Sequence, residues 1–163
     1  IGLEANRKIF KRAPFALNEF TIQRSETSSM ITVHTYLNDE HLNSYWADGL
    51  IISTPTGSTG YNLSCGGPVI YPHSKSYVLT PIAPHNLNVR PMVIPNDVTI
   101  KIEVEGRSKQ FLATLDSRLE TIDSDCVMTL KQAEFTANLV RLNPQNFLTA
   151  IREKLRWGED LRN

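Results

Sequence analysis

Residues 48–68 read DGLIISTPTGSTGYNLSCGGP, and this stretch passes from a continuous apolar run into a loop rich in glycine and hydroxyl residues. The run Gly49–Ser53 predicts a buried strand, because strands covered on both faces carry apolar residues without alternation. We expect a short helix after Pro55. Glycines let the backbone approach a ligand closely, and the loop has four of them: Gly57, Gly60, Gly66 and Gly67. Hydroxyls that can donate and accept hydrogen bonds are those of Thr54, Thr56, Ser58, Thr59 and Ser64.

Outward from this stretch, the chain up to residue 142 is a series of short strand patterns separated by turn residues. Val98–Val104 alternates strictly, which predicts one buried and one wet face. Asn38–Glu40 predicts a turn. The other predicted strands are Phe20–Arg24, Met30–Leu37, Leu42–Tyr45, Tyr77–Ile82, Met92–Ile94, Gln110–Leu115, Val127–Leu130 and Asn138–Leu142. Many short strands at close spacing predict a mainly β domain, of the β-sandwich kind, over residues 1–142.

Residues 143–163 change character and predict a terminal amphipathic helix. Asn143 suits the N-cap, Pro144 suits the first helical position, and Gly158 suits the end of the helix. One helical stripe is apolar and comprises Phe147, Leu148, Ile151 and Leu155. An exposed stripe would favour self-association, so we expect this helix to pack on another domain or on another copy of the chain.

The composition excludes several classes of protein. The 163 residues suit one domain, and 17 basic residues balance 17 acidic ones, so neither nucleic acid nor an anionic membrane is the expected main partner. No apolar run reaches the roughly 18 residues of a membrane span. Cys65 and Cys126 make no disulfide framework, and we expect two reduced thiols in a cytoplasmic protein. The chain starts with Ile1 instead of Met, and its first residues contain no helix cap or obvious turn, so we expect it to begin inside a longer protein.

Four segments resemble motifs of the NAD kinase family, in that family's order. Residues 48–61 closely resemble its long signature, and Ala16–Glu19 resembles its Asn-Glu motif. Residues 81–87, PIAPHNL, with Arg90 and Pro91 behind them, resemble its Pro-Ile-x-Pro-His-x-Leu segment, and KLRWG at 154–158 is also similar. These segments span most of the chain. The resemblance implies a β-sandwich-like carboxy-terminal, NAD-binding domain of an NAD kinase, with a short helix after the Gly/Ser/Thr loop and a terminal amphipathic helix.

NAD kinases transfer the γ-phosphoryl group of ATP, or of polyphosphate in some members, to the 2′-hydroxyl of the adenosine ribose of NAD, giving NADP. The resemblance thus implies NAD as substrate, ATP and Mg²⁺ as co-reactants, and a homo-oligomer, dimer or tetramer. The family's catalytic aspartate lies in an amino-terminal Gly-Gly-Asp-Gly-Thr motif. This chain lacks that motif, because its Gly66-Gly67 pair precedes Pro68. We therefore expect no catalytic residue here and an inactive chain when isolated.

The resemblance also implies where NAD is held. Asn18 and Glu19 match positions on the adenine side, and an Asn amide can meet the adenine edge with two hydrogen bonds. Asp48 matches a position that contacts the nicotinamide-side ribose, often across a subunit boundary. The family's Asp-Gly-Gln is replaced by Asp116-Ser117-Arg118, which keeps only the aspartate. The full set of predicted NAD-binding residues is Asn18, Glu19, Asp48, Thr56, Thr59, Gly60, Tyr61, Ser64, Ala83, His85 and Asp116.

Other interpretations stay open at this point. A glycine- and hydroxyl-rich surface loop without a ligand has the same composition, and the segment is neither a P-loop nor a Gly-x-Gly-x-x-Gly fingerprint. The chain could instead be a non-catalytic nucleotide-binding β-sandwich module. A lipid or sphingoid kinase ranks low, because that group lacks the signature of residues 48–61. A serine hydrolase of Ser64, His85 and Asp116 lacks the nucleophile elbow. A metal site is not predicted, because no two of His34, His41, His73 and His85 have helical i, i+4 spacing.

Overall fold

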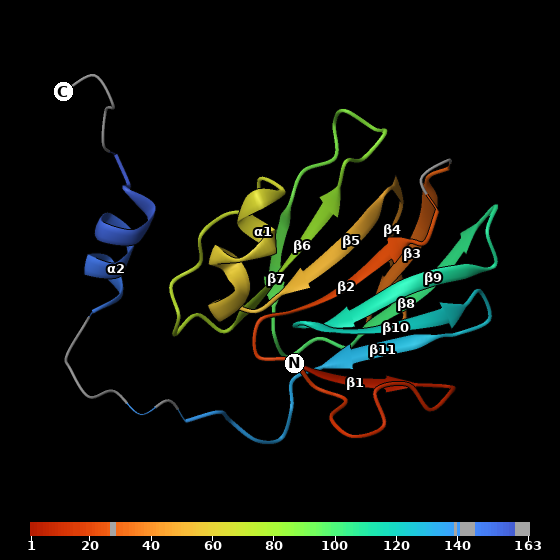
Figure 1. The fold of residues 1–163 in the computed structure, drawn as a ribbon, viewed down its shortest axis with the longest axis horizontal. Coiled ribbons are helices and arrows are strands. Elements are labelled where there is room, and N and C mark those ends of the chain that lie inside the picture. Colours follow the sequence, from red (N-terminus) through yellow and green to blue (C-terminus); the bar gives the residue numbers. More distant parts are fainter. Residues whose placement is uncertain (27–28, 139, 141–145, 159–163) are drawn as a thin grey trace.

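The computed structural model describes residues 1–26, 29–138, 140 and 146–158. Two antiparallel sheets make up most of it (Figure 1). The five-stranded sheet has the order β1 (Gly2–Ala5), β11 (Met128–Lys131), β8 (Ile100–Gly106), β3 (Ile31–Leu37) and β4 (Glu40–Ala47). The six-stranded sheet has the order β10 (Arg118–Asp123), β9 (Gln110–Leu115), β2 (Glu19–Arg24), β5 (Gly49–Ser53), β6 (Ser76–Ile82) and β7 (Met92–Pro95). The predicted mainly β fold is confirmed.

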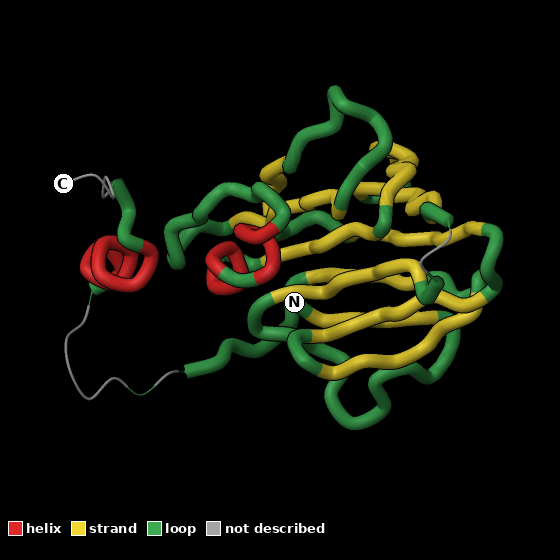
Figure 2. The backbone as a smooth tube through the Cα atoms, turned by 45° about the horizontal axis from the view of Figure 1, so that its top comes forward, coloured by secondary structure: helices red, strands yellow, loops and turns green. Residues whose placement is uncertain are grey.

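The hydrophobic core lies between the two sheets. Phe20 and Ile22 of β2 and Ile100 and Ile102 of β8 are fully buried members of one cluster. The alternation predicted for Val98–Val104 is confirmed over β8, where every second residue is buried up to Val104. All of β5 is buried, because a second layer covers its outer face. That layer consists of the 3-10 helix η1 (Thr56–Thr59) and the helix α1 (Tyr61–Ser64), which confirms the short helix expected after Pro55 (Figure 2).

The turn predicted at Asn38–Glu40 is a tight hairpin between β3 and β4. Asn38 and Asp39 have φ of 49° and 67°, the positive values that a two-residue turn of the primed type requires. A register shift between Thr35 and Tyr36 follows in β3. β4 is longer than the predicted run Leu42–Tyr45, because polar residues at its start also pair with β3.

Two strands were not predicted, and one predicted strand is wrong in part. β1 and β10 have polar or short patterns, and both gain order from pairing with a neighbour rather than from their own apolar residues. Asn138 and Val140 belong to no strand, and the rest of the predicted strand Asn138–Leu142 lies outside the described residues.

The terminal helix α2 (Phe147–Leu155) starts later than predicted. Its N-cap is Asn146, whose side chain accepts the N–H of Thr149 at 2.8 Å, so the prediction of Asn143 as cap is wrong. Asn143 and Pro144 lie outside the described residues. The helix ends at Leu155 because Arg156 adopts a left-handed conformation, three residues before the point expected from Gly158.

The predicted stripe of α2 is on the surface. None of the residues of α2 is buried, and Leu148 is 56% exposed. Phe147 of this helix lies edge-on to Tyr71 of the β domain, with ring centroids 5.3 Å apart. The partner expected for this stripe stays a prediction. Within the described ranges, no helix is long and apolar enough to cross a membrane.

Candidate functional site

The loop after β5 is seated on the residues that precede β2. The N–H of Thr54 donates to the carbonyl of Asn18 at 2.8 Å, and the Thr54 hydroxyl donates to the carbonyl of Leu17 at 2.6 Å. A Cβ on Gly57 would lie 2.2 Å from the Asn18 carbonyl oxygen, so the close approach requires glycine. The predicted Asn-Glu motif and the predicted loop are thus one structural unit.

Asp116 holds the same unit from the turn between β9 and β10. Its Oδ1 accepts the N–H groups of Asn18 at 2.7 Å and Glu19 at 3.3 Å, and its Oδ2 accepts that of Leu17 at 3.0 Å. Its own N–H donates to the carbonyl of Glu19 at 3.0 Å, with φ at the left-handed value of 52°. Asp116 therefore positions the backbone of the Asn-Glu motif. A direct contact with NAD, as the sequence suggested, stays a prediction.

Glu19 faces the loop across this junction. A Cβ on Gly60 would lie 3.5 Å from Oε2 of Glu19, which places the carboxylate beside the second glycine of the loop. Burial, and then the charge of Asp116, raise the pKa of the Glu19 carboxyl above its ordinary value of 4.5. Thr56 and Thr59 are exposed on the same turn. The four predicted residues Glu19, Thr56, Thr59 and Gly60 lie at one end of β2 and β5.

A cavity of about 290 Å³ opens beside this unit. Thr54, Thr56, Leu17 and Asp116 are among its lining residues, and so is Tyr77, whose pKa burial raises to about 12. The remaining lining residues are Ile1, Phe15, Ala16, Gln132, Ala133, Phe135, Thr136 and Ala137. Its volume is near the lower limit of the roughly 300–1,000 Å³ typical of small-molecule sites. It can hold part of a nucleotide between hydroxyl and apolar side chains.

Tyr61 and Asp48 are tied to β2 through two residues that the sequence analysis missed. Gln23 Nε2 donates to the Tyr61 hydroxyl at 3.0 Å, and Arg24 Nη2 donates to Asp48 Oδ2 at 2.9 Å. Burial, and then Cys65, raise the pKa of the Tyr61 hydroxyl, although 40% of the residue remains exposed. No pattern in the sequence pointed to Gln23 or Arg24, because their partners are 38 and 24 positions away in the chain.

Ala83 and His85 lie at the start of β5 rather than at its end. The N–H of Asp48 donates to the carbonyl of Ile82 at 2.9 Å, and Ala83 follows with a φ of 44°. His85 packs on Trp46, with ring centroids 4.1 Å apart, and its N–H donates to the Trp46 carbonyl. Asp48, Ala83 and His85 thus form a second group, separated from Asn18 and Thr56 by the length of β5.

Asn62 is the buried hub that holds the helical layer in place. Its Nδ2 donates to the carbonyls of Ser58 at 2.9 Å and Pro68 at 3.0 Å, and its Oδ1 accepts the Thr80 hydroxyl at 2.6 Å. A Cβ on Gly67 would lie 1.9 Å from Oδ1 of Asn62. The Ser58 hydroxyl is also committed, donating to the carbonyl of Pro55 at 2.7 Å. Some glycine and hydroxyl residues of this loop are therefore required for packing, and are not part of the exposed surface of the loop.

The structure does not assemble the serine hydrolase triad. His85 is stacked on Trp46, the Asp116 carboxylate accepts backbone N–H groups, and Ser64 is exposed at the end of α1. Burial raises the pKa of the Cys65 thiol, which disfavours a nucleophilic thiolate. Among the described residues, no group of three His, Cys, Asp or Glu side chains could hold a metal ion.

Residues 17–142 match the family model described as ATP-NAD kinase C-terminal domain. This chain belongs to that family. It is 55% identical to the NAD kinase of Flavobacterium johnsoniae over 160 residues, covering 98% of this chain and 54% of the relative. It is 59% identical to the NAD kinase of Christiangramia forsetii over 148 residues, covering 91% of this chain and 50% of the relative. The chain thus spans about half the length of the NAD kinases that it matches.

Solved structures of NAD kinases share the fold. Yeast NADH kinase, crystallised in complex with NADH, superposes with a TM-score of 0.85 over 98% of this chain and 50% of the yeast chain, at 23% identity. An NAD kinase from Archaeoglobus fulgidus in complex with ATP superposes with a TM-score of 0.70, at 28% identity, covering 82% of this chain and 50% of the other. The two-sheet architecture is therefore that of the NAD kinase C-terminal domain.

Proposed function

We propose that this chain is the NAD-binding part of an NAD kinase, which phosphorylates the 2′-hydroxyl of the adenosine ribose of NAD with ATP, or polyphosphate, as donor. Membership of the NAD kinase C-terminal domain family supports this assignment. So do the names of the two complexed structures, one with NADH and one with ATP. The main observation behind the proposal is the close backbone contact between Gly57 and Asn18, which joins the two motifs of the predicted site in one structural unit.

The arrangement suits a dinucleotide. Asp116 fixes the backbone of Asn18 and Glu19, so less backbone freedom is lost when the Asn18 amide binds an adenine edge. Thr56 supplies a hydroxyl at the cavity, and Tyr61 supplies a half-exposed ring, held by Gln23, for a sugar or a base. Asp48, next to Ala83 and His85, is separated from Asn18 by the length of β5. Two groups of polar residues at such a separation fit the two nucleoside ends of NAD.

We assign no step of phosphoryl transfer to this chain. That reaction needs metal-held phosphates and a positioned nucleophile. The described residues include no metal-binding group, so we assign no Mg²⁺ ligand here. Because this sequence lacks the Gly-Gly-Asp-Gly-Thr motif, we infer that the base is supplied by another part of the NAD kinase and that the chain alone makes no NADP.

Kinase activity of the full-length protein tests this proposal. Gly57→Ala pushes a methyl group into the Asn18 carbonyl, so we expect the KM for NAD to rise about tenfold or more, with a smaller effect on the KM for ATP. Gly2→Ala is the matched control, because a Cβ there meets its nearest atom at 3.6 Å. An unchanged KM for NAD in a Gly57→Ala protein with normal melting temperature would refute the assignment.

A further inference from the structure

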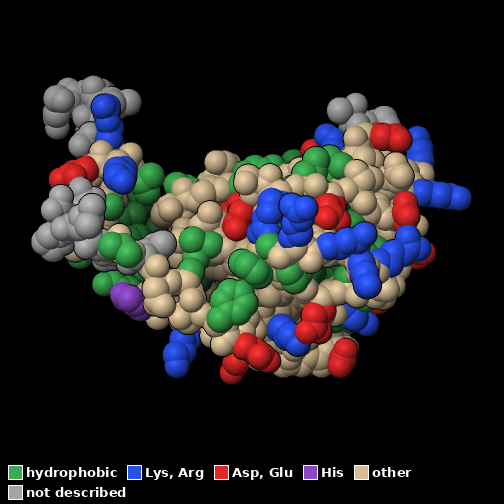
Figure 3. Space-filling model, turned by 60° about the horizontal axis from the view of Figure 1, so that its bottom comes forward, with side chains coloured by type: hydrophobic (Ala, Val, Ile, Leu, Met, Phe, Trp, Pro, Cys, Tyr) green, Lys and Arg blue, Asp and Glu red, His purple; other side chains and the backbone are tan. Residues whose placement is uncertain are grey.

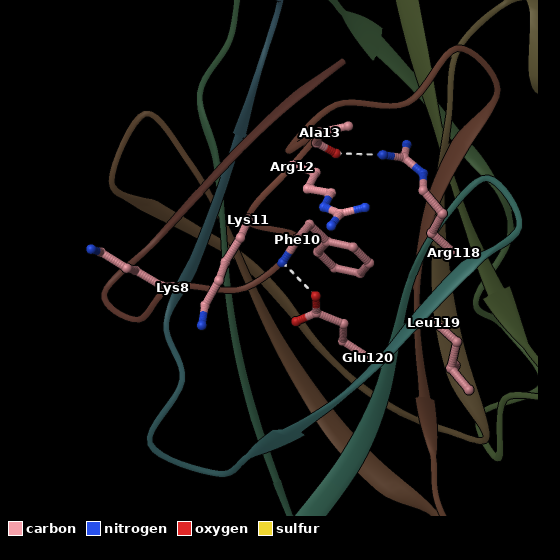
Figure 4. A pocket seen from close by; sticks show the side chains of 8 residues that line it. All are labelled: Lys8, Phe10, Lys11, Arg12, Ala13, Arg118, Leu119 and Glu120. Atoms are coloured by element: carbon pink, nitrogen blue, oxygen red, sulfur yellow. Dashed lines mark hydrogen bonds between the residues drawn. The ribbon is translucent and has the colours of Figure 1, made fainter.

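A basic cavity of about 490 Å³, which the nucleotide site does not use, lies beside the start of β10. It is lined by the loop that follows β1 and by the start of β10, and Figure 4 shows the side chains around it. The lining residues are Lys8, Phe10, Lys11, Arg12, Ala13, Arg118, Leu119 and Glu120. None of them is among the residues predicted to bind NAD. Figure 3 shows the face at the bottom of Figure 1, where β1 lies, and Lys and Arg side chains gather on it.

The charges around this cavity are strongly one-sided. The lining includes four cationic residues, Lys8, Lys11, Arg12 and Arg118, and one carboxylate, that of Glu120. Glu120 is already engaged, because its Oε1 accepts the N–H of Phe10 at 2.8 Å. The excess is local, since the whole chain has 17 basic and 17 acidic residues.

The cationic side chains of the cavity differ in the hydrogen bonds and ion pairs that they make within the protein. Arg118 donates to the carbonyls of Ala13 and Phe15 and lies 3.8 Å from Asp116, so it serves partly as a brace. Lys8, Lys11 and Arg12 make no ion pair with any described residue. Arg7, next to them in the chain, does pair, with Asp123 at 3.0 Å and with Asp125. Two carboxylates thus neutralise Arg7, whereas Lys8, Lys11 and Arg12 line the cavity without such a pair among the described residues.

The loop that carries these cations is anchored. Phe10 is 5% exposed within the hydrophobic core cluster and takes a left-handed φ of 48°. The N–H of Ala13 closes a turn onto the carbonyl of Phe10 at 3.1 Å. In Figure 4 the guanidinium group of Arg12 lies beside the Phe10 ring, and that of Arg118 reaches toward the carbonyl of Ala13. Like charges brought together on a fixed loop repel one another, and an anion between them relieves that repulsion.

We propose that this cavity binds a small anion that carries phosphate groups, at a site separate from the NAD site. Arginine side chains bind phosphate oxygens with two parallel hydrogen bonds, and lysines add point charge. The volume lies within the range of small-molecule sites. A nucleic acid would need an extended basic surface, whereas these cations surround a cavity of about 490 Å³. The proposal is independent of the nucleotide assignment, because the two sets of residues do not overlap.

Titration of the chain with pyrophosphate and with inorganic phosphate, by calorimetry at physiological ionic strength, tests the proposal. We expect saturable binding of pyrophosphate, tighter than that of phosphate because two phosphoryl groups meet more of the cations. The double variant Lys11→Ala, Arg12→Ala should weaken it about tenfold or more, since each change removes a charge-assisted hydrogen bond. Lys109→Ala, an exposed lysine outside the cavity, should leave it unchanged.

Two further variants make the outcome decisive. Lys11→Gln, Arg12→Gln keeps most of the side-chain volume, so weaker binding in that protein, at an unchanged melting temperature, reports lost charge rather than lost fold. Asn18→Ala, Tyr61→Ala alters only the predicted NAD site and should bind pyrophosphate as the parent does. Absence of saturable binding would overturn the proposal. So would binding that survives both cavity variants, or binding that is lost only with Asn18 and Tyr61.

Discussion

At Asp116, three backbone N–H groups of residues 17–19 converge on a single carboxylate. Hydrogen bonds to a charged acceptor contribute more than neutral ones, and removing the acceptor leaves the donors unpaired. We expect Asp116→Ala to lower the free energy of unfolding by about 2 kcal/mol, measured by urea denaturation. Asp97→Ala, at an exposed aspartate, is the control. An Asp116→Ala protein as stable as the parent would show that these contacts do not hold the motif.

Glu19 gives a pH dependence with a definite sign. Because the folded-state pKa of its carboxyl is raised, the folded protein binds this proton more tightly than the unfolded chain does. Its contribution favours folding below pH 4.5 and is lost as the pH rises from there through the raised folded-state pKa. We expect Glu19→Gln to be more stable than the parent at neutral pH, with the difference shrinking toward pH 4. Urea denaturation across this range checks it, with the exposed Glu40→Gln as control. A difference that grows on acidification would contradict the assigned cause.

At the scale of elements, the helical layer over β5 depends on one buried side chain. The fully buried side chain of Asn62 donates to two carbonyl groups and accepts the hydrogen bond of one hydroxyl. Asn62→Ala should cost about 3 kcal/mol of unfolding free energy, because it leaves these partners unpaired and opens a cavity. Calorimetric or urea unfolding measures this cost, with the exposed Asn88→Ala as comparison. A cost below about 0.5 kcal/mol would mean that η1 and α1 are held by other contacts.

The elements also show how far sequence reasoning reaches. Apolar runs such as Gly49–Ser53 and alternating runs such as β8 were predicted because their own residues carry the pattern. β10 was missed, because its order comes from the ladder with β9. The start of α2 was misplaced, since Asn143 and Asn146 both suit a cap and only the structure shows which side chain accepts an N–H.

The residues of the candidate site also fall into those that the sequence predicted and those that it missed. Asn18, Glu19, Thr56 and Gly60 were named from motifs, and the structure brings them together at one end of β2 and β5. Gln23, Arg24 and Tyr77 were missed, because their roles arise from partners distant in the chain and from burial that no local pattern encodes. Asp116 was named, but its bonds to three backbone N–H groups depend on residues about a hundred positions away in the chain.

At the scale of the whole molecule, the exposed stripe of α2 predicts self-association. Leu148 is 56% exposed. Among the described residues, Tyr71 is the one aromatic residue whose ring contacts Phe147. We expect the chain to sediment as a dimer or a larger oligomer, and Leu148→Glu to shift it toward the monomer. Thr149→Glu on the same helix is the control for added charge. A parent chain that sediments as a monomer at every concentration would contradict this expectation.

The central claim is that the dinucleotide site is built largely by this chain, and calorimetric titration with NAD and NADP tests it most directly. We predict saturable binding that Asn18→Ala, Tyr61→Ala weakens by at least about tenfold. Tyr71→Ala, which removes another exposed tyrosine, should leave it unchanged. A folded chain that binds neither nucleotide, or a double variant that binds as tightly as the parent, would contradict the account.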